Sequence, residues 1–145
     1  MIYLDTSVIA PFYWAEALSD TVEQLLRIET EPRLSQLVEV ELFSALSRRV
    51  RMGEISQEDA KGIVKRFQAD INSGFYTRIT LEQVHYNLAR DWISRFETPL
   101  RTLDALHLAI AAEQNLCLVT ADEALAVSAK TFGVEVQILR PKTEG

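Results

Sequence analysis

Residues 102–125 read TLDALHLAIAAEQNLCLVTADEAL and hold three successive elements of secondary structure. Apart from Asp104 and His107, the first ten residues are almost entirely apolar, which is typical of a buried helix. LCLVT, at 116–120, is a short apolar run of the kind that forms a strand buried on both faces. A second helix is predicted over 122–132. A buried strand between two helices favours an α/β fold with a mainly parallel sheet.

The same alternation extends along the rest of the chain. Further strands are predicted at 2–4, 33–35, 75–79 and 134–139, and further helices from Thr6 toward Pro11 and at 19–30, 36–53, 56–74 and 81–97. Ser19 and the pair Thr6-Ser7 are candidate N-caps, and Ser56 with Asp59 resembles a capping box. The glycines at 53 and 74 follow the ends of two helices that we expect to form a hairpin.

Length and composition predict a single domain. The chain has 145 residues, of which 48% are hydrophobic, so it can bury a substantial core. We expect one domain over 1–140 and a flexible tail at 141–145. The net charge of −6 argues against broad binding to nucleic acids or anionic membranes, although it leaves a local site open.

The cellular setting that the sequence predicts is the cytoplasm. Cys117 is the single cysteine, so no internal disulfide can form, and a reducing compartment is the simplest expectation. The start of the chain lacks a basic segment and has Asp5 within its apolar run, so it is a poor signal peptide. No window approaches the roughly 18 apolar residues of a membrane span.

Acidic residues recur where strands of the predicted sheet end. Asp5 follows the first strand, Asp122 follows the strand at 116–120, and Asp104 lies in the first turn of the helix before that strand. In open parallel sheets, ligands bind outside the carboxyl ends of the strands. A fourth acid comes from the helix at 36–53, where Glu39 and Glu41 both lie among apolar residues, and periodicity does not choose between them.

Each acid, taken alone, also has an ordinary structural explanation. Asp5 can belong to turn or cap chemistry. Asp104, two residues after a possible Thr102 cap, can be stabilised by the helix dipole by roughly 0.3 to 1 kcal/mol. Asp122 can cap its own helix, and Glu41 can pair with an arginine further along its helix.

Taken together, the four acids predict a divalent metal ion. Carboxylates brought to one edge of a sheet repel one another unless a cation lies between them. Oxygen ligands suit Mg²⁺ or Mn²⁺, and the sequence has no cluster of cysteine and histidine for zinc. A bound cation also reverses the local charge, so that an acidic protein can hold a phosphate.

Four stretches, in this order, resemble the PIN-domain ribonucleases and especially the VapC-type toxins of bacterial toxin-antitoxin pairs. They are YLDTSVIAPFY near the start, VEVELFSALSRR in the first third, and LRTLDALHLAIA and LVTADEAL toward the end. The resemblance covers nearly the whole chain. It implies a three-layer, Rossmann-like PIN domain with a central, mainly parallel sheet flanked by helices.

The resemblance also implies a site. Its catalytic acids would be Asp5, Glu41, Asp104 and Asp122, with Asp5, Asp104 and Asp122 as ligands of Mg²⁺ or Mn²⁺. Glu41 is preferred to Glu39 because it precedes SALSRR as the family's glutamate does. Thr120 matches a hydroxyl position close to the acids, and Ser7 is a second candidate. No acid of the pattern is missing, which favours an active enzyme.

The function that the resemblance implies is metal-dependent hydrolysis of RNA phosphodiester bonds by the toxin of a toxin-antitoxin pair. Its partners would be an RNA substrate, a cognate antitoxin that blocks the site, and a second copy of the chain in a homodimer. The alternative is a PIN-like binding or regulatory module without turnover.

Two other enzyme classes fit the sequence poorly. A haloacid-dehalogenase-like phosphatase resembles Asp-x-Asp after its first strand, whereas Ser7 occupies the third position here. A dinucleotide-binding fold needs a glycine-rich turn after that strand, and the first glycine of this chain is Gly53.

Other residues carry weaker signals. We expect His107 to be a hydrogen-bonded core histidine, although it can also bond Asp104 or contact RNA. The arginine cluster at 48, 49 and 51 can hold RNA phosphates or can simply be a solvated helix end. The aromatic run FYW at 12–14 is too long for all three rings to point inward, so it combines core packing with a possible contact surface.

Overall fold

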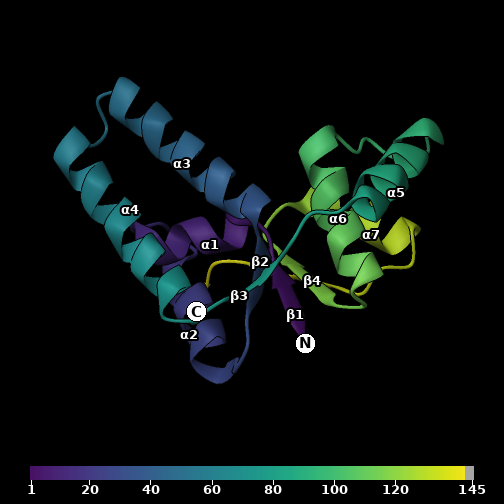
Figure 1. Cartoon of the computed structure of the whole chain (residues 1–145), viewed down its shortest axis with the longest axis horizontal. Coiled ribbons are helices and arrows are strands. Elements are labelled where there is room, and N and C mark those ends of the chain that lie inside the picture. Colours follow the sequence, from purple (N-terminus) through teal and green to yellow (C-terminus); the bar gives the residue numbers. More distant parts are fainter. Residues whose placement is uncertain (143–145) are drawn as a thin grey trace.

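The protein, represented by a computed structural model that describes residues 1–142, has a central sheet between two groups of helices (Figure 1). Its strands are β1 (Ile2–Leu4), β2 (Arg33–Ser35), β3 (Thr77–Ile79), β4 (Cys117–Thr120) and β5 (Val136–Ile138). Its helices are α1 (Thr6–Tyr13), α2 (Ser19–Ile28), α3 (Gln36–Arg51), α4 (Gln57–Asn72), α5 (Gln83–Ser94), α6 (Thr102–Glu113) and α7 (Glu123–Thr131). The predicted alternation of strands and helices is confirmed.

The five strands form one sheet in the order β3-β2-β1-β4-β5, and every pair is parallel. Tyr3 on β1 pairs with Leu118 on β4. From β1 the chain winds outward to β2 and β3 and then crosses back to β4 on the other side of β1. The order of the strands therefore reverses between β1 and β4, and this is where such sheets bind ligands, at the carboxyl ends of the strands.

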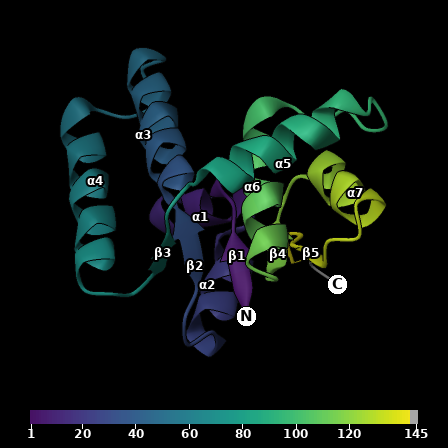
Figure 2. The same ribbon diagram turned by 45° about the vertical axis from the view of Figure 1, so that its right-hand side comes forward.

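Alternate side chains of the central strands enter two separate cores. Ile2 and Leu4 of β1 pack with residues of α1, α2, α3 and α4, whereas Tyr3 packs with residues of α5, α6 and α7. Leu118 and Val119 on β4 divide in the same way. Figure 2 shows these two helix groups on either side of the strands. The predicted three-layer arrangement is thus confirmed, and both faces of the sheet are buried.

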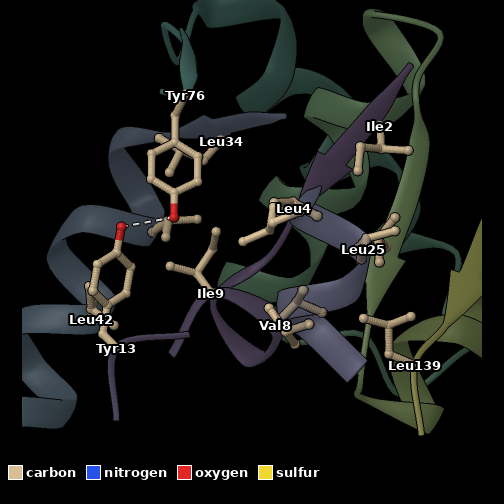
Figure 3. Close-up of a cluster of buried hydrophobic side chains, with 14 of the residues drawn as sticks. Ile2, Leu4, Val8, Ile9, Tyr13, Leu25, Leu34, Leu42, Tyr76 and Leu139 are labelled. Atoms are coloured by element: carbon tan, nitrogen blue, oxygen red, sulfur yellow. Dashed lines mark hydrogen bonds between the residues drawn. The ribbon is translucent and has the colours of Figure 1, made fainter. Parts of the chain in front are cut away.

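A tyrosine pair joins the first core to the helical hairpin of α3 and α4 (Figure 3). The hydroxyl groups of Tyr13 and Tyr76 are 2.8 Å apart, and the Tyr13 hydroxyl donates to Asp70 Oδ2 at 2.6 Å. Both rings pack against Phe67 of α4. Because buried hydroxyls need partners, these bonds fix α4 and the residue before β3 against the end of α1.

Three of the predicted helix ends are confirmed in detail. Ser56 Oγ accepts a hydrogen bond from the backbone N–H of Asp59 at 3.0 Å, which is one half of the predicted capping box. Gly53 and Gly74 follow α3 and α4 with φ angles of 74° and 80°, a backbone conformation that favours glycine.

Other predicted helix ends were wrong. Ser19 lies inside α2, and its hydroxyl donates to the carbonyl of Pro11 at 2.7 Å instead of capping the helix. Thr102 lies inside α6, whose N-cap is Arg101, without a side-chain cap bond. Helix α1 continues past Pro11 to Tyr13, although proline cannot donate the hydrogen bond that an interior helical residue makes.

The strands at 75–79 and 134–139 are shorter than predicted, since only Thr77–Ile79 and Val136–Ile138 pair. Of the expected tail at 141–145, residues 143–145 lie outside the described part of the chain. Among residues 1–142, no helix combines the length and hydropathy that a membrane crossing requires. One domain over 1–140 remains a prediction.

Candidate functional site

The candidate site lies where β1 and β4 end, at the reversal in strand order. Asp5 follows β1 directly, and Asp122 follows β4 by two residues. Asp104 lies in the first turn of α6, and Glu41 lies in the second turn of α3. Four separate elements therefore supply the acids, and the fold places each of them at the edge that the sequence predicted.

Asp5 is a buried carboxylate held by two hydroxyl groups. Only 4% of the residue is exposed. Ser7 Oγ donates to Asp5 Oδ1 at 2.6 Å, and Thr120 Oγ1 donates to Oδ2 at 2.6 Å. Burial raises the pKa of Asp5, while the imidazole of His107 and these two bonds act to lower it. Asp5 is thus oriented by groups from α1 and β4.

The expected capping role of this segment is wrong. Asp5 occupies the N-cap position of α1, but its carboxylate accepts no hydrogen bond from the backbone of that helix. The Ser7 hydroxyl turns instead to Asp5 and also accepts from the backbone N–H of Ala121 at 2.9 Å. Thr6 donates to Glu41 Oε1 at 2.9 Å. These hydroxyls therefore link acids that lie on separate elements, whereas a cap bond would have stayed within α1.

Glu41, and not Glu39, faces the other acids. Glu41 Oε1 is bonded by Thr6 and also by His107 Nε2, at 2.5 Å. Partial burial acts to raise the pKa of Glu41, but the imidazole of His107 and the hydroxyl of Thr6 outweigh it and lower the pKa. Glu39 forms a surface ion pair with Arg78, 2.6 Å from Glu39 Oε1 to the guanidinium.

His107 is buried and hydrogen-bonded, as expected, but its partner is a site residue. Its Nδ1 lies 2.6 Å from the hydroxyl of Tyr3, and its Nε2 bonds Glu41 and not Asp104. Sequence reasoning missed Tyr3 and Ser35, whose hydroxyls are 2.8 Å apart. The sequence did hold a signal for Tyr3: a tyrosine in a strand that is buried on both faces needs a buried polar partner for its hydroxyl.

Asp122 accepts a hydrogen bond from a helix backbone, whereas Asp104 has no bonded partner among residues 1–142. Asp122 Oδ1 accepts from the N–H of Leu125 at 3.0 Å, so it caps α7 as its ordinary explanation predicted. Asp104 is half-buried, and within residues 1–142 its carboxylate has no hydrogen bond or ion pair. Burial raises the pKa of Asp104, and the charges of Asp122 and Glu41 raise it further, while His107 and Arg101 act to lower it. Asp104 is therefore the acid of the cluster whose carboxylate has no bonded partner among residues 1–142.

These oxygens have the chemistry that a hard divalent cation requires. The charge of Glu41 acts on both Asp5 and Asp104, and the charge of Asp122 acts on Asp104, so all four acids share one neighbourhood. In the described part of the chain, no three acidic, histidine or cysteine side chains are close enough to enclose an ion by themselves. The free carboxylate of Asp104 nevertheless fits a cation, since repulsion among like charges is what an ion relieves.

A groove of about 660 Å³ opens beside Glu41. Helix α3 lines it with Glu41, Ser44 and Arg48, one turn apart on a single face. Trp14, directly after α1, and Leu103 of α6 also line it. Of the aromatic run at 12–14, Tyr13 is buried, whereas Trp14 lines this groove. The groove thus leads from an acid of the site onto the basic end of α3.

The three arginines of α3 differ in their surroundings. Arg49 lies over the ring of Trp14, 5.2 Å from its centroid, and its Nε is 3.5 Å from Glu54 Oε2. Arg51 donates to Ser47 Oγ at 2.6 Å. Arg48 is exposed, and its side chain has no polar partner among residues 1–142. Only Arg48 therefore presents an unengaged guanidinium to the groove.

The whole arrangement matches a known family. The family model for the PIN domain matches residues 2–130. The chain belongs to the PIN-domain family. The resemblance seen in the sequence is thereby confirmed. No curated protein is significantly similar to this PIN domain in sequence.

Solved structures with the same fold include proteins of toxin-antitoxin systems. FitAcB from Neisseria gonorrhoeae superposes with a TM-score of 0.73 at 18% identity, over 94% of this PIN domain and 96% of that chain. VapC20 from Mycobacterium tuberculosis, a sarcin-ricin loop cleaving toxin, gives 0.70 at 19% identity over 88% and 95%. VapBC2 from Rickettsia felis, bound to a promoter DNA fragment, gives 0.66 at 17% identity over 97% and 100%. At these identities the likeness shows the fold alone.

Proposed function

We propose that this PIN domain is a metal-dependent endoribonuclease that hydrolyses RNA phosphodiester bonds as the toxin of a toxin-antitoxin pair. The observation that carries the proposal is the state of Asp104. Its carboxylate is half-buried and unpartnered within the described residues, and the charges of Asp122 and Glu41 raise its pKa. A protein keeps such a group when a cation offsets the repulsion.

In this proposal Asp5, Asp104 and Asp122 hold Mg²⁺ or Mn²⁺. When bound, the ion supplies positive charge for the phosphate and lowers the pKa of water at the site. Asp5 is kept in place by Ser7 and Thr120, whose hydroxyls occupy one oxygen each. Asp122 is fixed by its cap bond to α7, and that bond uses only Oδ1.

Glu41 orients the attacking water or holds a second ion, and both roles need a fixed, ionised carboxylate. Its lowered pKa keeps it ionised at neutral pH. Arg48 contacts a phosphate of the RNA strand along the groove, since a guanidinium pairs well with phosphate and this one is free of internal partners among residues 1–142. The net charge of −6 then restricts RNA binding to this local surface.

The partners of the proposed toxin are a cognate antitoxin and a second copy of the chain, in the cytoplasm. A solved toxin-antitoxin complex from Klebsiella pneumoniae, which has the same fold, supports the antitoxin. The second candidate function is a PIN-like binding or regulatory module without turnover. It is favoured by the absence, among residues 1–142, of three metal-binding side chains already in place.

Metal binding and RNA cleavage, measured on the same preparations, test the proposal. We expect the chain to gain thermal stability with Mg²⁺ or Mn²⁺ and to cut single-stranded RNA only when the ion is present. Asp5→Asn should abolish cleavage. Asp20→Asn, on the exposed first turn of α2, is the matched control and should cleave normally.

Two outcomes would reject the enzyme. Cleavage that persists in chelator, or in Asp5→Asn, would show that these acids are not its catalytic centre. RNA binding without cleavage, at any concentration of either metal, would favour the regulatory module.

A further inference from the structure

The two oxygens of Glu41 are used differently. Oε1 accepts hydrogen bonds from both Thr6 Oγ1, at 2.9 Å, and His107 Nε2, at 2.5 Å. Oε2 accepts no hydrogen bond within residues 1–142. Two donors on one oxygen fix the rotation of the carboxylate and leave the other oxygen as the one that can meet a ligand.

The imidazole that bonds Glu41 is itself hydrogen-bonded to Tyr3 through its other nitrogen. Only 2% of His107 is exposed, and its Nδ1 lies 2.6 Å from the hydroxyl of Tyr3, which is fully buried. The Tyr3 hydroxyl is also 2.8 Å from Ser35 Oγ at the end of β2. A chain of hydrogen bonds therefore runs from Ser35 through Tyr3 and His107 to Glu41.

The direction of this chain follows from the acceptor at its end. An ionised carboxylate can only accept, so Nε2 of His107 must carry the proton that points at Glu41. In a neutral imidazole Nδ1 then accepts, and the Tyr3 hydroxyl must donate to it. The same hydroxyl oxygen accepts from Ser35. Tyr3 thus selects the tautomer of His107 that bonds Glu41.

The second buried histidine shows what a purely structural arrangement looks like in this protein. His85 is 1% exposed, and its Nε2 lies 3.1 Å from Glu113 Oε2. Its Nδ1 accepts from the backbone N–H of Glu82, which caps α5. His85 joins two helices and contacts no acid of the site, whereas His107 ends on Glu41.

We propose that His107 is a positioning residue for Glu41, with its tautomer set by Tyr3 and Ser35, so that Glu41 Oε2 is presented to the reacting groups. The proposal rests on the proposed nuclease function. It assigns His107 to the active site without contact to RNA, and it assigns a functional role to a tyrosine in the core of the sheet. Outer partners of this kind typically affect activity 10- to 100-fold.

Matched substitutions at the two histidines test the proposal by kinetics. His107→Leu should lower kcat for a short single-stranded RNA roughly 10- to 100-fold, with KM nearly unchanged, because RNA does not touch the imidazole. His107→Gln, whose amide can donate in place of Nε2, should recover most of kcat. His85→Leu should lower the melting temperature but leave kcat intact while the protein is folded. Tyr3→Phe, which keeps the ring and His107, should lower kcat less than His107→Leu.

A second measurement does not depend on turnover. In ¹⁵N spectra of the metal-free protein, His107 should carry a proton on Nε2, and Tyr3→Phe should shift the resonance of Nδ1. If wild-type protein cuts no RNA, the proposed function fails, and these spectra still decide the hydrogen-bond chain. An Nε2 without its proton would overturn the proposal. So would full kcat in His107→Leu, or a folded His107→Gln as impaired as His107→Leu.

Discussion

Thr120 Oγ1 donates a 2.6 Å hydrogen bond to Asp5 Oδ2, which joins the ends of β4 and β1 at the reversal in strand order. Both groups are buried, and the same threonine oxygen accepts from the N–H of Asp122 at 3.0 Å. One hydroxyl therefore orients one proposed metal ligand and fixes the backbone of another.

Thr120→Val tests this relationship because valine keeps the shape and removes the hydroxyl. Asp5 then keeps a buried oxygen without a donor, so we expect a loss of about 1 to 3 kcal/mol in the free energy of unfolding. Cleavage should fall as well. Denaturant unfolding and single-turnover kinetics measure the two effects. Thr131→Val, at an exposed position of α7, is the control; equal losses in both variants would contradict a specific role for Thr120.

Asp104→Asn should affect the stability of the protein differently with and without metal. In the metal-free protein it removes a charge that Asp122 and Glu41 repel, so stability should stay equal or rise by up to about 1 kcal/mol. With Mg²⁺ or Mn²⁺, the wild type should gain stability and the variant should gain little. Thermal melts with and without each ion give the comparison. A variant that gains as much as the wild type would exclude Asp104 as a ligand.

Arg48 and Arg49 are adjacent in sequence and should behave differently. Arg48→Ala should raise KM for RNA and reduce the slope of log affinity against log salt by about one, since one phosphate contact is lost. Arg49→Ala should lower stability, because it loses the contacts with Trp14 and Glu54. Binding to labelled RNA over a salt series, with melts of both proteins, measures each effect. An unchanged slope in Arg48→Ala would place the RNA elsewhere.

Glu113, which lies away from the site, should make the free energy of unfolding depend on pH. The hydrogen bonds from His85 and Gln114 lower the pKa of Glu113 below its ordinary value of 4.5. A carboxyl group whose pKa is lower in the folded state stabilises the protein when the pH is above its ordinary pKa. That stability is lost as the pH falls through the pKa of the folded state. Glu113→Gln should therefore destabilise the protein at neutral pH, by less than about 1 kcal/mol at this surface position. The difference should vanish in acid. A difference that is constant across pH would show that the charge of Glu113 is not the cause.

The sequence predicted the order of the elements and the edge where the acids meet. Short apolar runs such as residues 2–4 and 116–120 have the length of buried strands, and the carboxyl ends of parallel strands meet at one edge of the sheet. Asp5 follows such a run directly and Asp122 follows one by two residues, so chain connectivity alone places both near that edge. Helix ends were less predictable, as Ser19 and Thr102 show, because α2 and α6 begin one residue earlier than a hydroxyl cap would place them, with Leu18 and Arg101 at the N-cap.

The sequence by itself determined that the chain is a layered α/β domain with acids at the ends of its strands, since hydrophobic periodicity and connectivity are properties of the chain. Periodicity did not choose between Glu39 and Glu41; the family resemblance favoured Glu41, and only the tertiary structure shows it bonded to Thr6 and His107. Residues two apart on a helix point in nearly opposite directions, and both faces of α3 carry apolar residues. Tertiary packing likewise decided that one nitrogen of His107 bonds Glu41 and that the other bonds Tyr3. Side-chain partners from distant segments depend on how the layers meet, and no local pattern encodes that.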